Sequence, residues 1–259
     1  MFKWSRKQSR VPEGPPGRRA YVVGDVHGRL DLLDRLLDQI HEELRVDPAE
    51  QTTLVFVGDL IDRGPSSAQV VERLRTYAQP GVQPVFLAGN HEEVLLRILD
   101  GDGSLISSWL RFGGKQCLAS YGLDPLLLTG RSEDESVRMV REVIPADHAT
   151  FLRTFIDTCR FGDFLFVHAG LRPGVPLDSQ RQSDLRWIRD AFLNDDRDHG
   201  FVVVHGHTIG KKVVERQNRI GIDTGAYSSG VLTALAVEGD RRWFLDTRAP
   251  VDAAVSATH

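Results

Sequence analysis

Short apolar runs and amphipathic segments alternate through the first hundred residues. Residues 21–23 and 54–57 are apolar runs that stop at a glycine, and 85–87 is a third run, a pattern typical of buried strands. Apolar positions between 32 and 44 share one helical face, and 70–77 repeats that spacing after Ser66 or Ser67 as a cap. A third helix is expected over about 91–99. The alternation predicts right-handed crossovers and a largely parallel core sheet.

This rhythm changes after residue 100. The glycine-punctuated segment 100–160 has helix-like stretches at 137–143 and 148–159, so we predict a mostly helical insertion that stays with the domain. Strand-like runs resume at 164–167 and 201–204. Four short apolar runs between 213 and 245 predict a meander that forms a second sheet packed on the first. The expected fold class is α/β, or α+β.

Composition and chain ends narrow the class of protein. We expect 1–19 to be a flexible basic leader, 20–246 a single domain and 247–259 a frayed tail. No apolar stretch approaches the ~20 residues of a membrane span, and the leader lacks the apolar region of a signal peptide. Cys117 and Cys159 are interpreted as reduced structural thiols of a cytoplasmic protein. The net charge of -4, with mixed signs, argues against nucleic-acid binding but allows a small anionic substrate.

Side chains that bind metals follow five of the apolar runs. The segments are GDVHG at 24–28, GDLIDRG at 58–64, GNHE at 89–92, HAG at 168–170 and HGHT at 205–208. Because the carboxyl ends of strands in an open α/β sheet meet at one crevice, these segments can share a site. Mixed His, Asp and Asn ligands favour Mn, Fe or Zn over Ca. Two ions ~3.5–4 Å apart need a shared carboxylate, and Asp59 is the natural candidate.

Each segment also has an ordinary structural interpretation. A Gly-Asp after a strand is commonly a turn, and a single His168 at a strand end is commonly a satisfied polar residue. The GNHE segment can start a helix, with Asn90 as N-cap and the Glu92 carboxylate favoured by the helix dipole. All five patterns arising by accident in this order is very improbable.

The order of these motifs resembles the phosphoprotein phosphatase family of calcineurin-like metallophosphoesterases, and within it the compact bacterial and bacteriophage lambda-type Ser/Thr phosphatases. The resemblance covers about 21–237 and is weakest in the insertion. It implies a two-sheet β-sandwich flanked by helices, an α-β-β-α arrangement, with the metals at one end. It also implies a hydrolase that binds two divalent ions, with Mn first and Fe or Zn as alternatives.

The resemblance also implies a ligand set. Asp25, His27 and Asp59 are expected to hold one ion, and the other ion has four expected ligands: Asp59, Asn90, His168 and His207. The family ligand is the His of Gly-His-Thr, which favours His207 over His205.

The same resemblance implies the catalytic groups. His91 corresponds to a general acid that Asp62 orients, while Arg63 and Arg189, together with Asn90, correspond to residues that bind the phosphate. A hydroxide formed between the two ions attacks phosphorus in line, and no phosphoenzyme is required. The segment 222–226 is interpreted as a structural turn near the site.

Three functions are weighed. The first is hydrolysis of Ser/Thr phosphoproteins by a monomeric cytoplasmic bacterial enzyme without nucleic-acid or membrane partners. The second is symmetrical hydrolysis of diadenosine tetraphosphate, with an adenosine pocket from Trp109, Arg111 and Phe112, although core packing with a solvated Arg is the preferred interpretation of these three. The third is a non-catalytic phosphate-binding protein, which the presence of all six ligand positions argues against.

Overall fold

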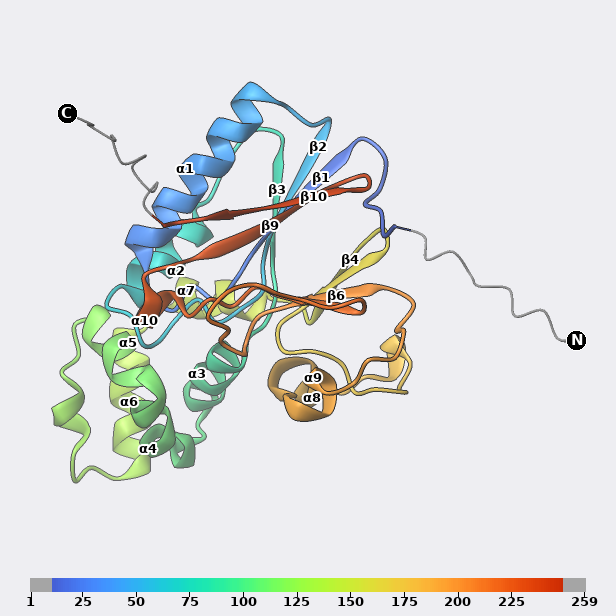
Figure 1. Cartoon of the computed structure of the whole chain (residues 1–259). Coiled ribbons are helices and arrows are strands. Elements are labelled where there is room, and N and C mark those ends of the chain that lie inside the picture. Colours follow the sequence, from blue (N-terminus) through green and yellow to red (C-terminus); the bar gives the residue numbers. More distant parts are fainter. Residues whose placement is uncertain (1–10, 249–259) are drawn as a thin grey trace, which may run out of the picture.

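The computed structural model describes residues 11–248 and contains two five-stranded sheets, which pack face to face with helices outside (Figure 1). The strand orders are β10-β9-β1-β2-β3 and β4-β5-β6-β8-β7. The expected two-sheet sandwich flanked by helices is therefore confirmed. None of the helices in 11–248 has the length and apolar character needed to cross a bilayer.

The first sheet has a parallel centre and an antiparallel edge. Its strands are β1 (Arg18–Val23), β2 (Gln51–Phe56), β3 (Val82–Phe86), β9 (Thr233–Glu238) and β10 (Arg241–Asp246). β1, β2 and β3 pair in parallel, whereas β9 runs antiparallel to both β1 and β10. Both faces are buried: Tyr21 and Val23 face the helices, and Ala20 and Val22 face the other sheet. The continuous apolar run of β1 follows from this double burial.

Helices α1 (Leu30–Val46), α2 (Ser67–Arg75) and α3 (Asn90–Asp100) follow the parallel strands, as the alternation predicted. The apolar face of α1 is buried against the first sheet. The predicted caps are wrong in detail. Ser66 occupies the N-cap of α2 without a side-chain bond, and Gly89 rather than Asn90 is the N-cap of α3.

The second sheet repeats this design. Its strands are β4 (Thr158–Phe161), β5 (Phe164–Val167), β6 (Val202–His205), β7 (Val214–Glu215) and β8 (Arg219–Gly221). β5, β6 and β8 are parallel, and β4 and β7 form antiparallel edges. The outer face packs on α8 (Gln182–Trp187) and α9 (Asp190–Leu193), chiefly through Leu185 and Phe192. A 3₁₀ turn, η4 (Leu177–Ser179), precedes them.

The predicted insertion is mostly helical and packs beside α2 and α3, in green at the lower left of Figure 1. It contains η1 (Gly103–Leu105), α4 (Ile106–Trp109), η2 (Leu110–Gly114), α5 (Lys115–Ser120), η3 (Pro125–Leu128), α6 (Glu133–Val143) and α7 (Ala146–Arg153). The helix expected over 148–159 is too long. α7 ends at Arg153, and Thr158–Phe161 pairs with β5 across a turn at Gly162, whose φ is +60°.

The prediction that the C-terminal strands form one meander within the second sheet is wrong. β7 and β8 belong to the second sheet, but β9 and β10 join the first, after the short helix α10 (Ala226–Ser229). The physical reason is that β9 is buried on both faces. Ala234 and Ala236 contact the helical layer, while Leu235 and Val237 pack between the sheets.

The chain ends are better ordered within the described range than we expected. Arg19, assigned to the leader, is 1% exposed in β1 and pairs with Asp47 at 2.8 Å and Glu238 at 2.9 Å. Thr247, assigned to the tail, is buried and donates its backbone N–H to the Leu232 carbonyl at 3.0 Å. The rest of both predictions, 1–10 and 249–259, lies outside the described residues.

Candidate active site

The six predicted ligands lie together at one end of the sandwich. Asp25, Asp59 and Asn90 follow β1, β2 and β3 of the first sheet. His168 follows β5 and His207 follows β6 of the second sheet. All six side chains, including His27, are buried. The carboxyl ends of parallel strands from two sheets therefore build one polar cluster inside the protein.

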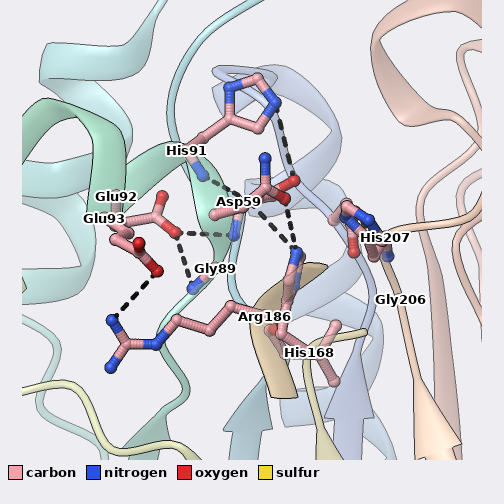
Figure 2. Close-up of polar contacts among 12 residues, drawn as sticks. Asp59, Gly89, His91, Glu92, Glu93, His168, Arg186, Gly206 and His207 are labelled. Atoms are coloured by element: carbon pink, nitrogen blue, oxygen red, sulfur yellow. Dashed lines mark hydrogen bonds and ion pairs between the residues drawn. The ribbon is translucent and has the colours of Figure 1, made fainter. Parts of the chain in front are cut away.

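Asp59 is the centre of this cluster (Figure 2). Its Oδ1 lies 3.4 Å from Nε2 of His168, and its Oδ2 lies 3.6 Å from Nε2 of His27 and 3.8 Å from Nε2 of His91. Two groups of potential ligand atoms share Asp59, one with His168 and His207 and the other with His27 and His91. This is the arrangement that a bridging carboxylate requires. The second group contains His91 where the sequence predicted Asp25.

Backbone carbonyls fix two of the imidazole tautomers. Nδ1 of His27 lies 2.8 Å from the Ile61 carbonyl oxygen, and Nδ1 of His168 lies 2.8 Å from that of Val57. A carbonyl only accepts hydrogen bonds, so each Nδ1 carries the proton. The Nε2 lone pairs of both rings are consequently directed at Asp59, as in metal-binding histidines.

Several buried acceptor atoms in the cluster lack a hydrogen-bond donor. Asp25 Oδ1, His27 Nε2 and His207 Nε2 have no partner within the described residues. The Asn90 side-chain oxygen lies 3.0 Å from the Nε2 lone pair of His168, so two acceptors face each other. Unsatisfied buried acceptors are costly in free energy, and a cation satisfies them together. The residues present therefore fit divalent metal ions.

The protonation states support the same conclusion. Burial lowers the pKa of His27 and of His207 to about 3, which keeps both rings neutral at pH 7. Burial, reinforced by the charges of Asp223 and Asp59, raises the pKa of Asp25 well above its usual range. Crowded carboxylates beside neutral imidazoles form a site that needs positive charge.

Backbone strain is concentrated at the cluster. Positive φ angles occur at five non-glycine residues of the described chain, and all five were predicted as site residues: His27, Asp59, Asp62, Arg63 and His207. Such conformations carry a free-energy cost and persist where the surroundings impose them, which is common at functional sites.

Two glycines allow the loops to approach the ligands. A Cβ on Gly206 would lie 2.0 Å from Asp25 Oδ1, and one on Gly89 would lie 2.3 Å from both the backbone N and Oδ1 of Asp59. Neither glycine is needed for a positive φ. The requirement at both positions is space.

Glu92 has a role that the helix-dipole interpretation missed. Its buried carboxylate accepts the backbone N–H groups of Asp59 and Leu60 at 2.8 Å and of Gly89 at 3.1 Å (Figure 2). Burial and the charge of Asp59 raise the pKa of Glu92 to about 7. Glu92 thus ties the start of α3 to the loop that presents Asp59.

His91 and Asp62, the two residues predicted to act as an acid pair, are in contact. Nδ1 of His91 lies 2.6 Å from Asp62 Oδ2. Burial lowers the pKa of His91, but the charges of Asp59 and Asp62 outweigh it and raise this pKa to about 9. The Arg63 guanidinium lies 3.1 Å from Nε2 of His91, a contact that requires the neutral ring because guanidinium only donates. Cations bound at Asp59 oppose its charge and favour that neutral form.

The predicted arginines differ in their surroundings. Arg63 lies over the ring of Tyr227, 4.9 Å from its centroid. Arg189 is exposed, and its charge adds to the lowering of the His207 pKa that burial begins. Arg186, not assigned from the sequence, approaches Glu93 at 3.4 Å (Figure 2).

His205 points away from the ligand cluster. Its Nδ1 lies 3.0 Å from the Gly206 carbonyl oxygen and its ring meets Phe192 edge-on, so the structure sets it apart from His207. Asp223, placed by the sequence in a structural turn, is buried beside Asp25 and accepts the Gly225 N–H at 2.9 Å. Burial raises the pKa of Asp223 to about 6.

The three residues considered for an adenosine pocket differ in burial and do not line one pocket. Core packing is confirmed for Trp109, which is 2% exposed, and Arg111 lies at the surface as expected, but core packing is wrong for Phe112, which is 64% exposed. No aromatic face of Trp109 is available for stacking on a base.

Known proteins with similar sequences carry two kinds of name, serine/threonine-protein phosphatase and bis(5'-nucleosyl)-tetraphosphatase. The chain is 41% identical over 225 residues to serine/threonine-protein phosphatase 2 of Escherichia coli, which covers 83% of this chain and 91% of that protein. It is 30% identical over 235 residues to serine/threonine-protein phosphatase 1 of Salmonella typhimurium, covering 85% and 93%. It is 26% identical over 235 residues to an asymmetrical bis(5'-nucleosyl)-tetraphosphatase of Anoxybacillus flavithermus, covering 83% and 88%.

The fold has solved relatives as well. A structure provisionally described as a diadenosine tetraphosphatase superposes with a TM-score of 0.61 at 23% identity, covering 89% of this chain and 94% of that one. The family that matches residues 18–228 is described as calcineurin-like phosphoesterase, and this span includes every ligand predicted above. With two sheets that place a shared carboxylate among histidines, and with this match over most of its length, the chain belongs to the calcineurin-like phosphoesterase family.

Proposed function

We propose that this protein is a cytoplasmic, monomeric Ser/Thr phosphoprotein phosphatase that uses two divalent metal ions, with Mn favoured over Fe and Zn. The observation that carries the proposal is the set of buried acceptors without donors around Asp59, next to the His91–Asp62 pair. The serine/threonine phosphatase names of the relatives at 41% and 30% identity support the substrate class.

The proposed ligands divide between two ions that share Asp59. His27 and Asp25 complete one site, and the other site has Asn90, His168 and His207. When bound, the ions lower the pKa of the attacking water and offset the negative charge of the phosphate.

The chain's own residues then bind the substrate and move a proton. Arg63 and Arg189 donate hydrogen bonds to the phosphate oxygens, for which the planar guanidinium is well suited. When Arg63 binds the phosphate it no longer occupies His91 Nε2, and that nitrogen can take up a proton from solvent. His91 donates this proton to the departing serine or threonine oxygen, while Asp62 holds Nδ1 and stabilises the imidazolium.

The proposal is tested with a phosphoserine peptide and Mn²⁺. His91→Ala should lower kcat by about 10²- to 10⁴-fold, the range for loss of a general acid, and Asp59→Asn should abolish turnover while the protein stays folded. His41→Ala is the matched control, because His41 stacks on Tyr77 outside the site. Near wild-type hydrolysis by either site variant rules the assignment out.

A second candidate is symmetrical hydrolysis of diadenosine tetraphosphate, which the name of a 28% identical relative, a symmetrical bis(5'-nucleosyl)-tetraphosphatase of Dechloromonas aromatica, supports. The burial of Trp109 removes one of the stacking residues this substrate was expected to use. Assaying the phosphopeptide and the dinucleotide side by side at equal Mn²⁺ separates the two, because the ratio of kcat/KM values identifies the preferred phosphoester.

A further inference from the structure

The helical insertion reaches the acid pair through Trp109. This residue ends α4 and is 2% exposed. Its indole Nε1–H donates a hydrogen bond to Asp62 Oδ2 at 2.9 Å. The same oxygen lies 2.6 Å from Nδ1 of His91. One carboxylate oxygen therefore accepts from two rings that come from different parts of the chain.

We propose that Trp109 is a positioning residue for proton transfer, acting on His91 through Asp62. The proposal rests on the function proposed above, with His91 as the proton donor. Asp62 is fully buried, and its Oδ1 has no hydrogen-bond partner within the described residues. The indole and the imidazole both donate to Oδ2, and the buried Cys117 thiol also interacts with this carboxylate. The orientation of the carboxylate in turn sets that of the His91 ring.

The same turn of the insertion supports the neighbouring residue, Arg63. The Gly113 carbonyl accepts the Arg63 backbone N–H at 3.1 Å. A Cβ on Gly113, whose φ is +121°, would lie 2.6 Å from both the Cγ and the backbone N of Arg63. A Cβ on Gly114 would lie 2.4 Å from the Trp109 ring. Gly114 therefore lets the turn pack against the Trp109 indole, and Gly113 lets it pack against Arg63.

Support at this point has a clear physical purpose. Asp62 and Arg63 are consecutive non-glycine residues with φ of +70° and +64°. Left-handed conformations carry a cost for such residues and relax unless contacts hold them. Within the described chain, the contacts on this loop include Trp109, Gly113 and Ser67, whose Oγ accepts the Asp62 N–H at 2.9 Å.

The test compares leaving groups. Trp109→Phe keeps an aromatic ring in the core but removes the N–H donor. Trp243→Phe is the matched control, because its indole also donates to a carboxylate, that of Glu43 at 3.1 Å, but this carboxylate lies in the last turn of α1 and not in the acid pair. For both variants, kcat and KM are measured with a phosphoserine peptide and with p-nitrophenyl phosphate. The alkoxide of serine needs a proton as it leaves, whereas p-nitrophenolate does not.

Trp109→Phe should lower kcat on the phosphopeptide about tenfold or more, with KM unchanged, and should change kcat on p-nitrophenyl phosphate less than about twofold. In an Asp62→Asn background, Trp109→Phe should add no further loss, because the two residues act as one unit. A parallel fall on both substrates, no fall on either, or multiplying losses in the double variant overturns the proposal.

A second measurement keeps Trp109 in place, so that it tests the contact even if Trp109→Phe does not fold. The Trp109 indole ¹H–¹⁵N resonance, assigned by replacing the other tryptophans, should shift in Asp62→Asn, while that of Trp243 stays. An unmoved Trp109 resonance also overturns the proposal. If the wild-type protein hydrolyses neither substrate, the proposed function itself fails. If the wild type and His91→Ala behave as expected but Trp109→Phe does not discriminate between the two substrates, only the proposed role of Trp109 fails.

Discussion

Replacing Gly206 with alanine is expected to disable the proposed metal site and to destabilise the fold. The added Cβ lies 2.0 Å from Asp25 Oδ1 and 2.8 Å from a methyl group of Val57. A carbon and an oxygen normally stay ~3.3 Å or more apart, so Asp25 must move by over ~1 Å. Its other oxygen is held by the His207 N–H at 2.9 Å, which means that this movement breaks a buried hydrogen bond.

The expected magnitude follows from these contacts. Loss of this hydrogen bond, which leaves a buried donor unsatisfied, costs about 1–3 kcal/mol and overpacking adds about 1–3 kcal/mol, so unfolding in chelator should become about 2–6 kcal/mol easier. Metal ligands tolerate only about 0.2 Å of displacement, so Mn²⁺ affinity should fall at least tenfold and turnover with it. Urea unfolding, calorimetric Mn²⁺ titration and phosphopeptide turnover measure the three quantities.

Gly81→Ala is the control for this substitution. Gly81 has a φ of +76° and nothing within 4 Å of an added Cβ. Alanine there should cost about 1–2 kcal/mol through backbone strain alone, with normal Mn²⁺ affinity and turnover. Wild-type metal affinity in Gly206→Ala, or an equal loss of affinity in Gly81→Ala, refutes the reasoning.

Three further predictions concern other parts of the molecule. Burial raises the pKa of Cys117 well above its usual range, so iodoacetamide at pH 8 should alkylate Cys117 only after the protein unfolds. The half-buried Cys159 should be alkylated sooner, and equal alkylation rates of the two thiols in peptide mass spectrometry would contradict this prediction. Arg189→Gln should raise KM for the phosphopeptide about tenfold. The melting temperature should not fall, because the exposed Arg189 side chain makes no ion pair within the described residues. A lower melting temperature with an unchanged KM would instead indicate a structural role. Arg19→Met should destabilise the fold by about 1–3 kcal/mol in urea because it leaves two carboxylates unpaired, and an unchanged midpoint contradicts it.

The parts of the fold that the sequence predicted well are those that one local pattern determines. A short apolar run ending at a glycine identified β1 and β2, and apolar positions that share one helical face identified α1. The convergence of Asp25, Asp59 and Asn90 could be predicted because they follow β1, β2 and β3, parallel strands that all end at the same edge of the first sheet.

The parts that could not be predicted depend on which distant surface an element meets. The apolar residues of β9 fit either sheet, and only pairing with β1 decides between them. Glu92 and Trp109 look like a helix-start residue and a core residue, because their partners lie about 30 and 47 positions away in loops whose course no local pattern encodes. Buried polar networks of this kind are fixed by tertiary structure.

The proposed metal ligands come from both sheets, and this has a consequence for how long the protein survives in a cell. An ion held by Asp59 and His168 would join the end of one sheet to the end of the other. Binding at a hundred times the dissociation constant adds about 2.7 kcal/mol to the folded state, which makes the opened, protease-sensitive form about a hundredfold rarer. Metal starvation is therefore expected both to stop turnover and to speed degradation, so that the amount of this protein follows the supply of its metal.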